Sequence, residues 1–387
     1  MSVPRDFWAG TYRKRYKEDV MGSIKKLKIK KNNVFDYATY LFVIVVFVIV
    51  TALNSAGALS RSQQGWLVPA CCYIVMAISL NLTVGIMGEL SLGHAGFMSV
   101  GAFSGAVVST SLADAVPDKW LRLLLAVVIG AVLAGIMGFL IGIPVLRLRG
   151  DYLAIVTLAF GEIIKDLINC LIVGVDSNGL HVIFNATGSK TVNDLGLVEG
   201  GKAIIKGAQG TVGVQRIATF TAGFVLIIVS LVIVLNLVRS RTGRAIIAVR
   251  DNRIAAEACG INVMKYKMIA FTISAAIAGA AGALYGLNYT GITAAKFDFN
   301  TSILILVFVV LGGLGNMLGS VIAAALLYLL PEVLRGFSDY RMLIYAVILI
   351  LVMIFKNNEQ LKFLILKAIS PITNLLGGAK KGERQNG

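Results

Sequence analysis

A short glycine-rich segment holds polar side chains between two apolar stretches of the sequence. Glu89, Ser91 and His94 lie within it, and glycines stand at positions 85, 88, 93 and 96. Charged and polar groups among apolar residues are costly, and irregular backbone at membrane depth must face protein or water. We therefore interpret Glu89, Ser91 and His94 as candidate lining of a route for a polar solute. The alternative is that the segment is a cytoplasmic turn.

A second polar group contains Glu162, Lys165 and Asp166, which follow about ten apolar residues. Residues three apart lie on one side of a helix, so Glu162 and Lys165 can neutralise each other there. We favour a structural ion pair for Glu162 and Lys165 over a proton relay.

The sequence contains one pattern that resembles a nucleotide-binding loop. Gly196 to Lys202 reads G-x-x-x-x-G-K, but Ala203 stands where a Ser or Thr would hold magnesium. We therefore expect no nucleotide site and no enzymatic activity in this chain. Any ATP and magnesium would be bound by partner subunits.

The sequence contains few residues that could bind a metal or form a disulfide. There are two histidines, His94 and His181, and no C-x-x-C pattern. No catalytic, cofactor-binding or metal-ligating set is expected. The cysteines are interpreted as small buried apolar residues: Cys71, Cys72, Cys170 and Cys259.

The composition explains why these polar groups stand out. Hydrophobic residues make up 57% of the 387 residues and charged residues only 14%, against about 25% charged in soluble domains. Apolar runs long enough to cross a bilayer recur along the chain. The predicted fold is an all-α polytopic transmembrane bundle. The net charge of +16 then indicates cytoplasmic loops and tails rather than nucleic-acid binding.

We predict about ten spans within a membrane domain at 35–356, between a basic tail at 1–34 and a second tail at 357–387. Ser302–Leu334 would be about 50 Å long as one helix, so we predict two elements with a turn at Gly312, Gly313 and Gly315. The other spans are Tyr37–Leu53, Trp66–Val84, Ala95–Leu112, Leu121–Ile143, Tyr152–Val173, Ile217–Val238, Met268–Tyr289 and Arg341–Phe355.

Charge bias supports this topology. With ten spans and a cytoplasmic N-terminus, both termini and the loop 239–267 lie inside. Its part Ser240–Lys267 carries six Lys or Arg against two acidic residues, whereas the loop 176–215, on the outer side, carries three of each sign. An excess of positive charge on the cytoplasmic side is the expected pattern.

Glycine pairs four residues apart occur in several spans. This spacing allows helices to pack closely and carries no chemistry of its own. The pairs are Gly101 and Gly105, Gly138 and Gly142, Gly282 and Gly286, and Gly315 and Gly319.

The loop 239–267 predicts one amphipathic helix. Ile247, Ile254, Ala258 and Ile261 share a face at helical spacing, and Gly260 is suited to end the helix in a left-handed conformation. Such a helix could dock onto another protein or lie on the membrane surface.

The same loop resembles the EAA loop by which permeases of ABC importers contact their ATPases. Ala255, Ala256 and Gly260 match its A-A-x-x-x-G pattern, and Ile254 replaces the common Glu. Four further blocks, in the correct order, resemble LivM-type permeases of branched-chain amino acid ABC importers, although Glu89 replaces a usual Gln. The blocks are Asn81–Ala102, Leu146–Lys165, Gly260–Gly286 and Ser302–Leu334.

This resemblance implies a permease subunit in a bacterial inner membrane that carries Leu, Ile or Val with energy from other subunits. Its implied partners are a LivH-type permease, two cytoplasmic ATPases and an extracytoplasmic solute-binding protein. Arg244, Ala255, Ala256 and Gly260 would then belong to the ATPase coupling element. The alternatives are a urea, short-amide or other amino acid permease, or an ion-coupled secondary transporter.

Overall fold

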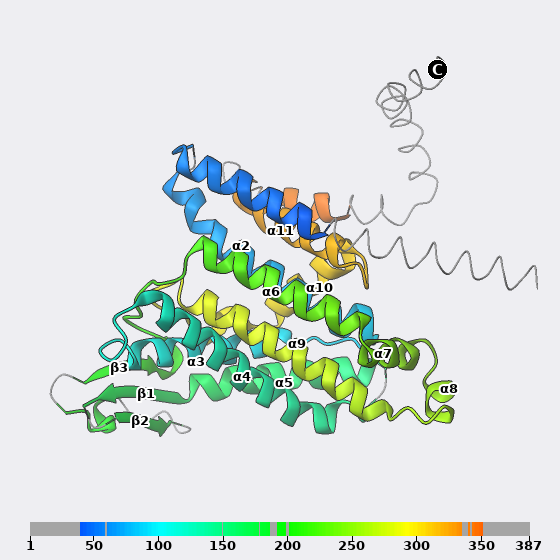
Figure 1. Ribbon diagram of the computed structural model, residues 1–387. Helices are drawn as coiled ribbons and strands as arrows, with labels where there is room; N and C mark the ends of the chain where they lie inside the picture. Colours follow the sequence, from blue (N-terminus) through cyan, green and yellow to red (C-terminus); the bar gives the residue numbers. More distant parts are fainter. Residues whose placement is uncertain are drawn as a thin grey trace, which may run out of the picture.

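The computed structural model describes residues 39–350 except 59, 149, 178, 186–191, 199–200, 335–339 and 341–342. Both predicted tails, 1–34 and 357–387, lie outside the described residues. The described part is a bundle of long helices with a small sheet at one end and two short helices, α7 and α8, at the other (Figure 1).

Each predicted span corresponds to a helix, although the last is described only over 343–350. The first helix is Thr39–Ser55. The long helices after it are α2 (Arg61–Asn81), α3 (His94–Ser111), α4 (Lys119–Val145), α5 (Asp151–Asn169), α6 (Phe220–Arg239), α9 (Val263–Gly286), α10 (Phe299–Gly312) and α11 (Met317–Val333).

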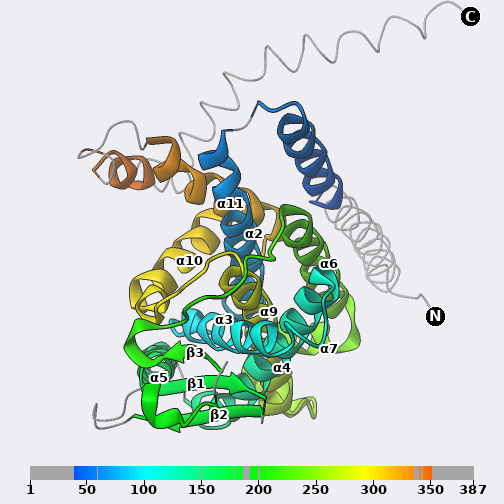
Figure 2. The same ribbon diagram turned by 90° about the vertical axis from the view of Figure 1, so that its left-hand side faces the viewer.

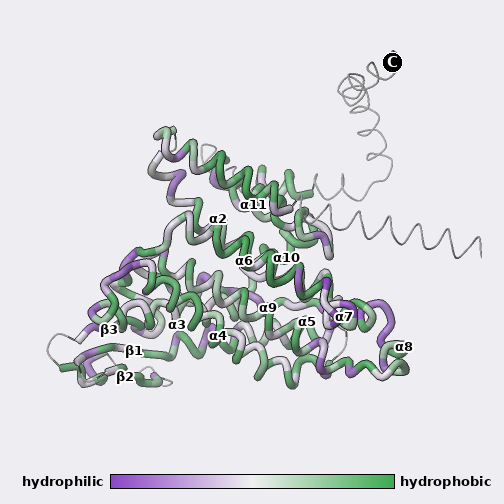
Figure 3. Tube along the Cα trace, viewed as in Figure 1, coloured by the Kyte–Doolittle hydropathy of each residue, from purple (hydrophilic) through white to green (hydrophobic). Residues whose placement is uncertain are grey.

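Five of the described helical segments are long and apolar enough to cross a membrane by length and composition. They contain α2, α4, α6, α9 and α10. Hydrophobic residues cover most of the bundle, and hydrophilic residues gather near α7 and α8 and near the sheet (Figure 3). The polytopic helical prediction is therefore confirmed.

The region between α5 and α6 contains a sheet that was not predicted from the sequence. Strands β1 (Leu171–Asp176), β2 (Gly179–Phe184) and β3 (Lys202–Lys206) pair antiparallel in the order β2–β1–β3. The predicted span Tyr152–Val173 is therefore too long, because α5 ends at Asn169 and the chain continues as a strand. Lys202 opens β3, so the G-x-x-x-x-G-K pattern leads into a strand rather than a helix.

Three neighbouring helices, α3, α4 and α9, pack closely through small residues (Figure 2). A Cβ at Gly101 would lie 1.9 Å from the carbonyl oxygen of Gly279, and a Cβ at Gly282 would lie 1.9 Å from that of Met98. The predicted close packing is confirmed for these glycines. Gly315 differs, because it lies in a turn with φ +79°.

The cysteines only partly follow the prediction of burial. Cys71 and Cys72 are buried in α2, whereas Cys170 is partly exposed and Cys259 is exposed. All four are free thiols.

Candidate functional site

The glycine-rich segment forms an irregular junction between α2 and α3. After Asn81 the chain continues as a π-helix, Leu82–Met87, and residues 88–93 are non-helical before α3 begins at His94. Gly88 ends the π-helix with φ +80°. We call residues 82–93 the junction.

A buried polar cluster joins the start of α3 to two other helices. His94 Nε2 lies 2.9 Å from Ser79 Oγ in α2 and 3.0 Å from Ser274 Oγ in α9. Ser79 Oγ also donates to the Ser274 carbonyl at 2.6 Å, and Ser274 Oγ donates to the Ser79 carbonyl at 2.7 Å. All three residues are fully buried, so the cluster fixes the beginning of α3 against α2 and α9.

The cluster also shows how deep α3 begins. Ser274 lies near the middle of α9, which spans Val263–Gly286. At 1.5 Å per residue, the distance from Val263 to Ser274 is about 16 Å, roughly half of an apolar bilayer core. His94 therefore lies level with the middle of α9, and α3 starts inside the bundle rather than at its end. Broken helices at this depth are a recurring feature of transporter binding sites.

Neighbouring side chains accept hydrogen bonds from backbone donors in the junction and in the first turn of α3. Leu92 N donates to Thr157 Oγ1 of α5 at 3.0 Å, and Ala95 N donates to Ser302 Oγ of α10 at 3.2 Å. Irregular backbone is stable at membrane depth only with such partners. The junction is thus integrated into the protein and is not a simple surface turn.

The three candidate pathway residues occupy different environments. Glu89 forms an ion pair with Lys267 of α9, and both side chains are largely buried. The Ser91 hydroxyl and His94 Nδ1 are buried and have no hydrogen-bond partner among the described residues. Glu89 therefore has a structural partner that the sequence did not reveal, and the pathway role of all three residues stays a prediction.

The predicted turn between two helices is confirmed. α10 ends at Gly312 and α11 begins at Met317, with Gly313 at φ +105° and Gly315 at φ +79° in between. Asn81 Oδ1 accepts from Gly315 N at 2.8 Å, and Asn81 Nδ2 donates to Ser320 Oγ at 2.9 Å. Asn81 thereby fixes the turn beside the junction.

The prediction of one amphipathic helix in the loop 239–267 is wrong. The loop forms two helices, α7 (Arg241–Asp251) and α8 (Arg253–Ala258), which we call the coupling segment together with residues 259–262. Asn252 interrupts the helix because its extended backbone lets its Oδ1 accept from Ala255 N at 3.0 Å. Ile254, placed on the predicted apolar face, is 80% exposed.

A small cluster holds the coupling segment against the chain. Ala256 is buried with Val249 of α7 and Val263 of α9, so it faces inward. Ala255, by contrast, is exposed. Arg244 is exposed as well, and its Nη1 donates to the Arg239 carbonyl at 3.0 Å.

Gly260 adopts the left-handed conformation that its position predicts, with φ +79°. Gly260 N donates to the Glu257 carbonyl and Ile261 N donates to the Ala256 carbonyl, both at 3.0 Å. This pair of hydrogen bonds is a Schellman motif, which ends α8 and turns the chain into α9.

One contact joins the coupling segment directly to the junction. Arg250 Nη1 of α7 donates to the Gly85 carbonyl at 3.0 Å. A Cβ at Gly88 would lie 2.5 Å from Arg250 Cγ, so glycine lets the arginine approach. This contact was not predicted from the sequence, although the glycines at 85 and 88 were a signal of close approach.

The comparisons with known proteins agree with this arrangement of helices. A family described as "Branched-chain amino acid transport system / permease component" matches residues 63–354. The chain belongs to this permease family.

Three relatives illustrate the match. The Escherichia coli (strain K12) high-affinity branched-chain amino acid transport system permease protein LivM is 35% identical over 322 residues, covering 81% of this chain and 72% of the relative. Salmonella typhimurium LivM is 34% identical over 349 residues, covering 89% of this chain and 79% of the relative. Pseudomonas aeruginosa BraD is 25% identical over 262 residues, covering 66% of this chain and 79% of the relative. No solved structure matches the chain significantly.

In this branched-chain amino acid permease family member, the Glu162–Lys165 ion pair expected from the spacing is present. Glu162 has a second partner, because its Oε1 accepts from Phe299 N at 3.1 Å at the start of α10. The pair thus joins α5 to α10.

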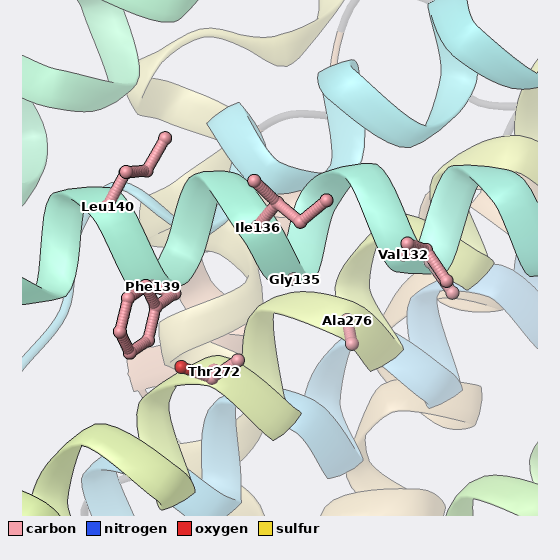
Figure 4. A pocket seen from close by; sticks show the side chains of 8 residues that line it. Val132, Gly135, Ile136, Phe139, Leu140, Thr272 and Ala276 are labelled. Carbon is pink, nitrogen blue, oxygen red and sulfur yellow. The ribbon is translucent and has the colours of Figure 1, made fainter.

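The permease also has an apolar groove on its surface between α4 and α9 (Figure 4). Val132, Ile136 and Phe139 from α4 and Ala276 from α9 contribute to its lining. Such walls suit an acyl chain and offer no charge to a zwitterionic amino acid. The groove is therefore a poor candidate for the substrate route. Within the described residues, no group of His, Cys, Asp and Glu is arranged to hold a metal ion.

Proposed function

We propose that this chain is the membrane subunit of an ABC importer that translocates leucine, isoleucine and valine with energy from partner ATPases. The family match over residues 63–354 supports this proposal, as do the names of the LivM relatives. The structural observation that carries it is the hydrogen bond from Arg250 to the Gly85 carbonyl. This bond links an exposed loop to broken backbone inside the bundle, as energy coupling requires.

The proposed assembly contains a LivH-type permease, two cytoplasmic ATPases that bind ATP and magnesium, and an extracytoplasmic solute-binding protein. The chain itself contributes no nucleotide site. Both termini and the coupling segment face the cytoplasm of a bacterial inner membrane. Supporting this orientation, α7 and α8 lie at the opposite end of the bundle from the sheet, and the loop 239–267 is the more basic of the two (Figure 1).

The ATPase docks on the solvent-exposed surface of the coupling segment. Ile254 and Ala255 are exposed there, and an exposed isoleucine beside a small alanine offers apolar area and close approach. Ala256 supports this surface from beneath, because it packs on Val249 and Val263. Gly260 sets the direction in which α9 leaves, and Arg244 lies at the exposed side of α7.

The substrate route passes the junction. Ser91 Oγ and His94 Nδ1 are buried polar atoms without a protein partner among the described residues, and both lie at the start of α3. Water or the polar groups of a passing amino acid would satisfy them. Glu89 contributes by holding Lys267 beside the same segment.

Uptake into vesicles that contain the full complex tests the function. We expect leucine uptake that requires internal ATP, persists when ion gradients are collapsed, and is inhibited by isoleucine and valine but not by urea. Uptake that follows an ion gradient without ATP would support the secondary transporter instead. Inhibition by urea or short amides would assign the chain to the other substrate class.

A further inference from the structure

The outer half of α5 carries charge on a helix face that the described chain leaves open. Asp166 is exposed, and Glu162 and Lys165 retain 34% and 22% of their side-chain exposure. Ile163, three residues before Asp166 and therefore on the same side of the helix, is also exposed. Asp298, at the beginning of α10, adds a third carboxylate to the neighbourhood.

These charges lie level with the middle of α9. A Cβ at Gly96 of α3 would lie 3.0 Å from Gly161 Cα, so Gly161 is level with the first turn of α3. That turn begins at His94, which contacts Ser274 near the midpoint of α9. Glu162 follows Gly161, and Asp166 lies about 6 Å further along the helix.

The open face of α4, unlike that of α5, carries no charge between residues 124 and 143. Its exposed side chains between residues 124 and 143 are apolar, as a lipid-facing helix requires: Leu124, Val128, Val132, Leu133, Ile136, Phe139, Leu140 and Ile143. A carboxylate that faces lipid within the apolar core of a bilayer is strongly disfavoured. Lipid is therefore a suitable neighbour for α4 but not for the charged part of α5.

We infer that the second permease subunit of the importer covers the face formed by the outer half of α5 and the beginning of α10. Three carboxylates, those of Glu162, Asp166 and Asp298, stand there against the ammonium groups of Lys165 and of Lys296, which lies over the Tyr289 ring. The partner therefore presents cationic or hydrogen-bond-donating groups, which complement the negative excess. This inference rests on the proposed function, because it requires a heteromeric permease.

Site-specific photo-crosslinking in the assembled complex tests the interface. A photoreactive amino acid replaces Ile163 on α5, and the matched control replaces Ile136 on α4, which is 50% exposed like Ile163. We expect the probe at Ile163 to capture the second permease subunit many-fold more efficiently than the probe at Ile136. Membrane insertion of each variant is checked by its yield in the membrane fraction.

Three results would overturn the inference. They are capture of lipid alone from position 163, equal capture of the second subunit from both positions, or capture of another copy of this chain from position 163. The readout does not depend on the transported solute. An error in the substrate would therefore change the uptake results and leave the crosslinking pattern intact.

Discussion

Arg250 and Gly85 are 165 residues apart in sequence, yet the arginine side chain donates a hydrogen bond to the glycine carbonyl at 3.0 Å. The same guanidinium also binds Asp251 Oδ1 through Nη2 at 2.9 Å. Arg250 therefore connects the exposed α7 to the π-helix that precedes α3. A movement of the coupling segment can therefore reach the junction through this side chain.

Replacing Arg250 should uncouple these two parts. Hydrogen bonds to charged groups contribute about 1.5–3 kcal/mol, so Arg250→Ala is expected to lower ATP-driven leucine uptake about ten-fold or more. The ATPase should remain bound. Arg147→Ala is the control, because it removes a similar guanidinium that is exposed and lies outside the coupling segment. Equal losses in both variants would argue against a specific role for Arg250.

The Glu89–Lys267 pair changes what a mutation at Glu89 reports. Glu89→Leu leaves the largely buried ammonium of Lys267 unpaired, at a cost of about 3–5 kcal/mol. We expect a lower yield of assembled complex. The double variant Glu89→Leu/Lys267→Met removes both charges and should restore assembly, as measured by co-purification. A double variant that assembles no better than Glu89→Leu would contradict the pair.

Leucine uptake by the double variant then tests the route itself. If residues at the junction line the pathway, uptake falls although the complex assembles and hydrolyses ATP. Uptake at the wild-type rate would show that Glu89 has only a structural role.

Gly260 should tolerate some residues and not others. Its φ of +79° costs a β-branched residue about 1–2 kcal/mol, whereas asparagine adopts this region more readily. A Cβ at this position would meet no atom within 4 Å, so conformation alone separates the variants. Gly260→Val is expected to abolish substrate-stimulated ATP hydrolysis or to release the ATPase. Gly260→Asn should retain most of both, and indistinguishable variants would refute the conformational argument.

The small-residue packing of α3 and α9 predicts a sharp difference between two glycines in helices. Gly282→Ala places a Cβ 1.9 Å from the Met98 carbonyl oxygen, and overpacking of this kind costs about 1–3 kcal/mol. Gly65→Ala in α2 meets no atom within 4 Å and should stabilise the helix by about 0.5–1 kcal/mol. Thermal unfolding of the purified complex should show a lower midpoint only for Gly282→Ala.

The helices of this protein were predictable because the length of each apolar run is visible in the sequence and can be compared with the thickness of a bilayer. The turn near Gly313 followed from the same length argument. The break at Asn252 was not foreseen, because the apolar spacing from Ile247 to Ile261 suited one helix while a single asparagine side chain capped a second one. The strand at Leu171 was missed because its apolar residues continued the pattern of α5.

The candidate site was harder to predict for a related reason. Sequence placed Glu89, Ser91 and His94 together because they are neighbours in the chain. Their partners come from elsewhere: Lys267 and Ser274 from α9. Contacts between residues this far apart depend on the packing of whole helices, which no local spacing reveals.

The contacts between α3, α4 and α9 bear on how such a protein can move. Gly101 and Gly279 meet backbone to backbone, without flexible side chains that could absorb a shift. These helices therefore behave as one solid block, and α8 is connected to the edge of that block through the turn at Gly260. A change of access across the membrane is then expected to be a rigid-body rotation of the whole block, with residues 82–93 as the hinge.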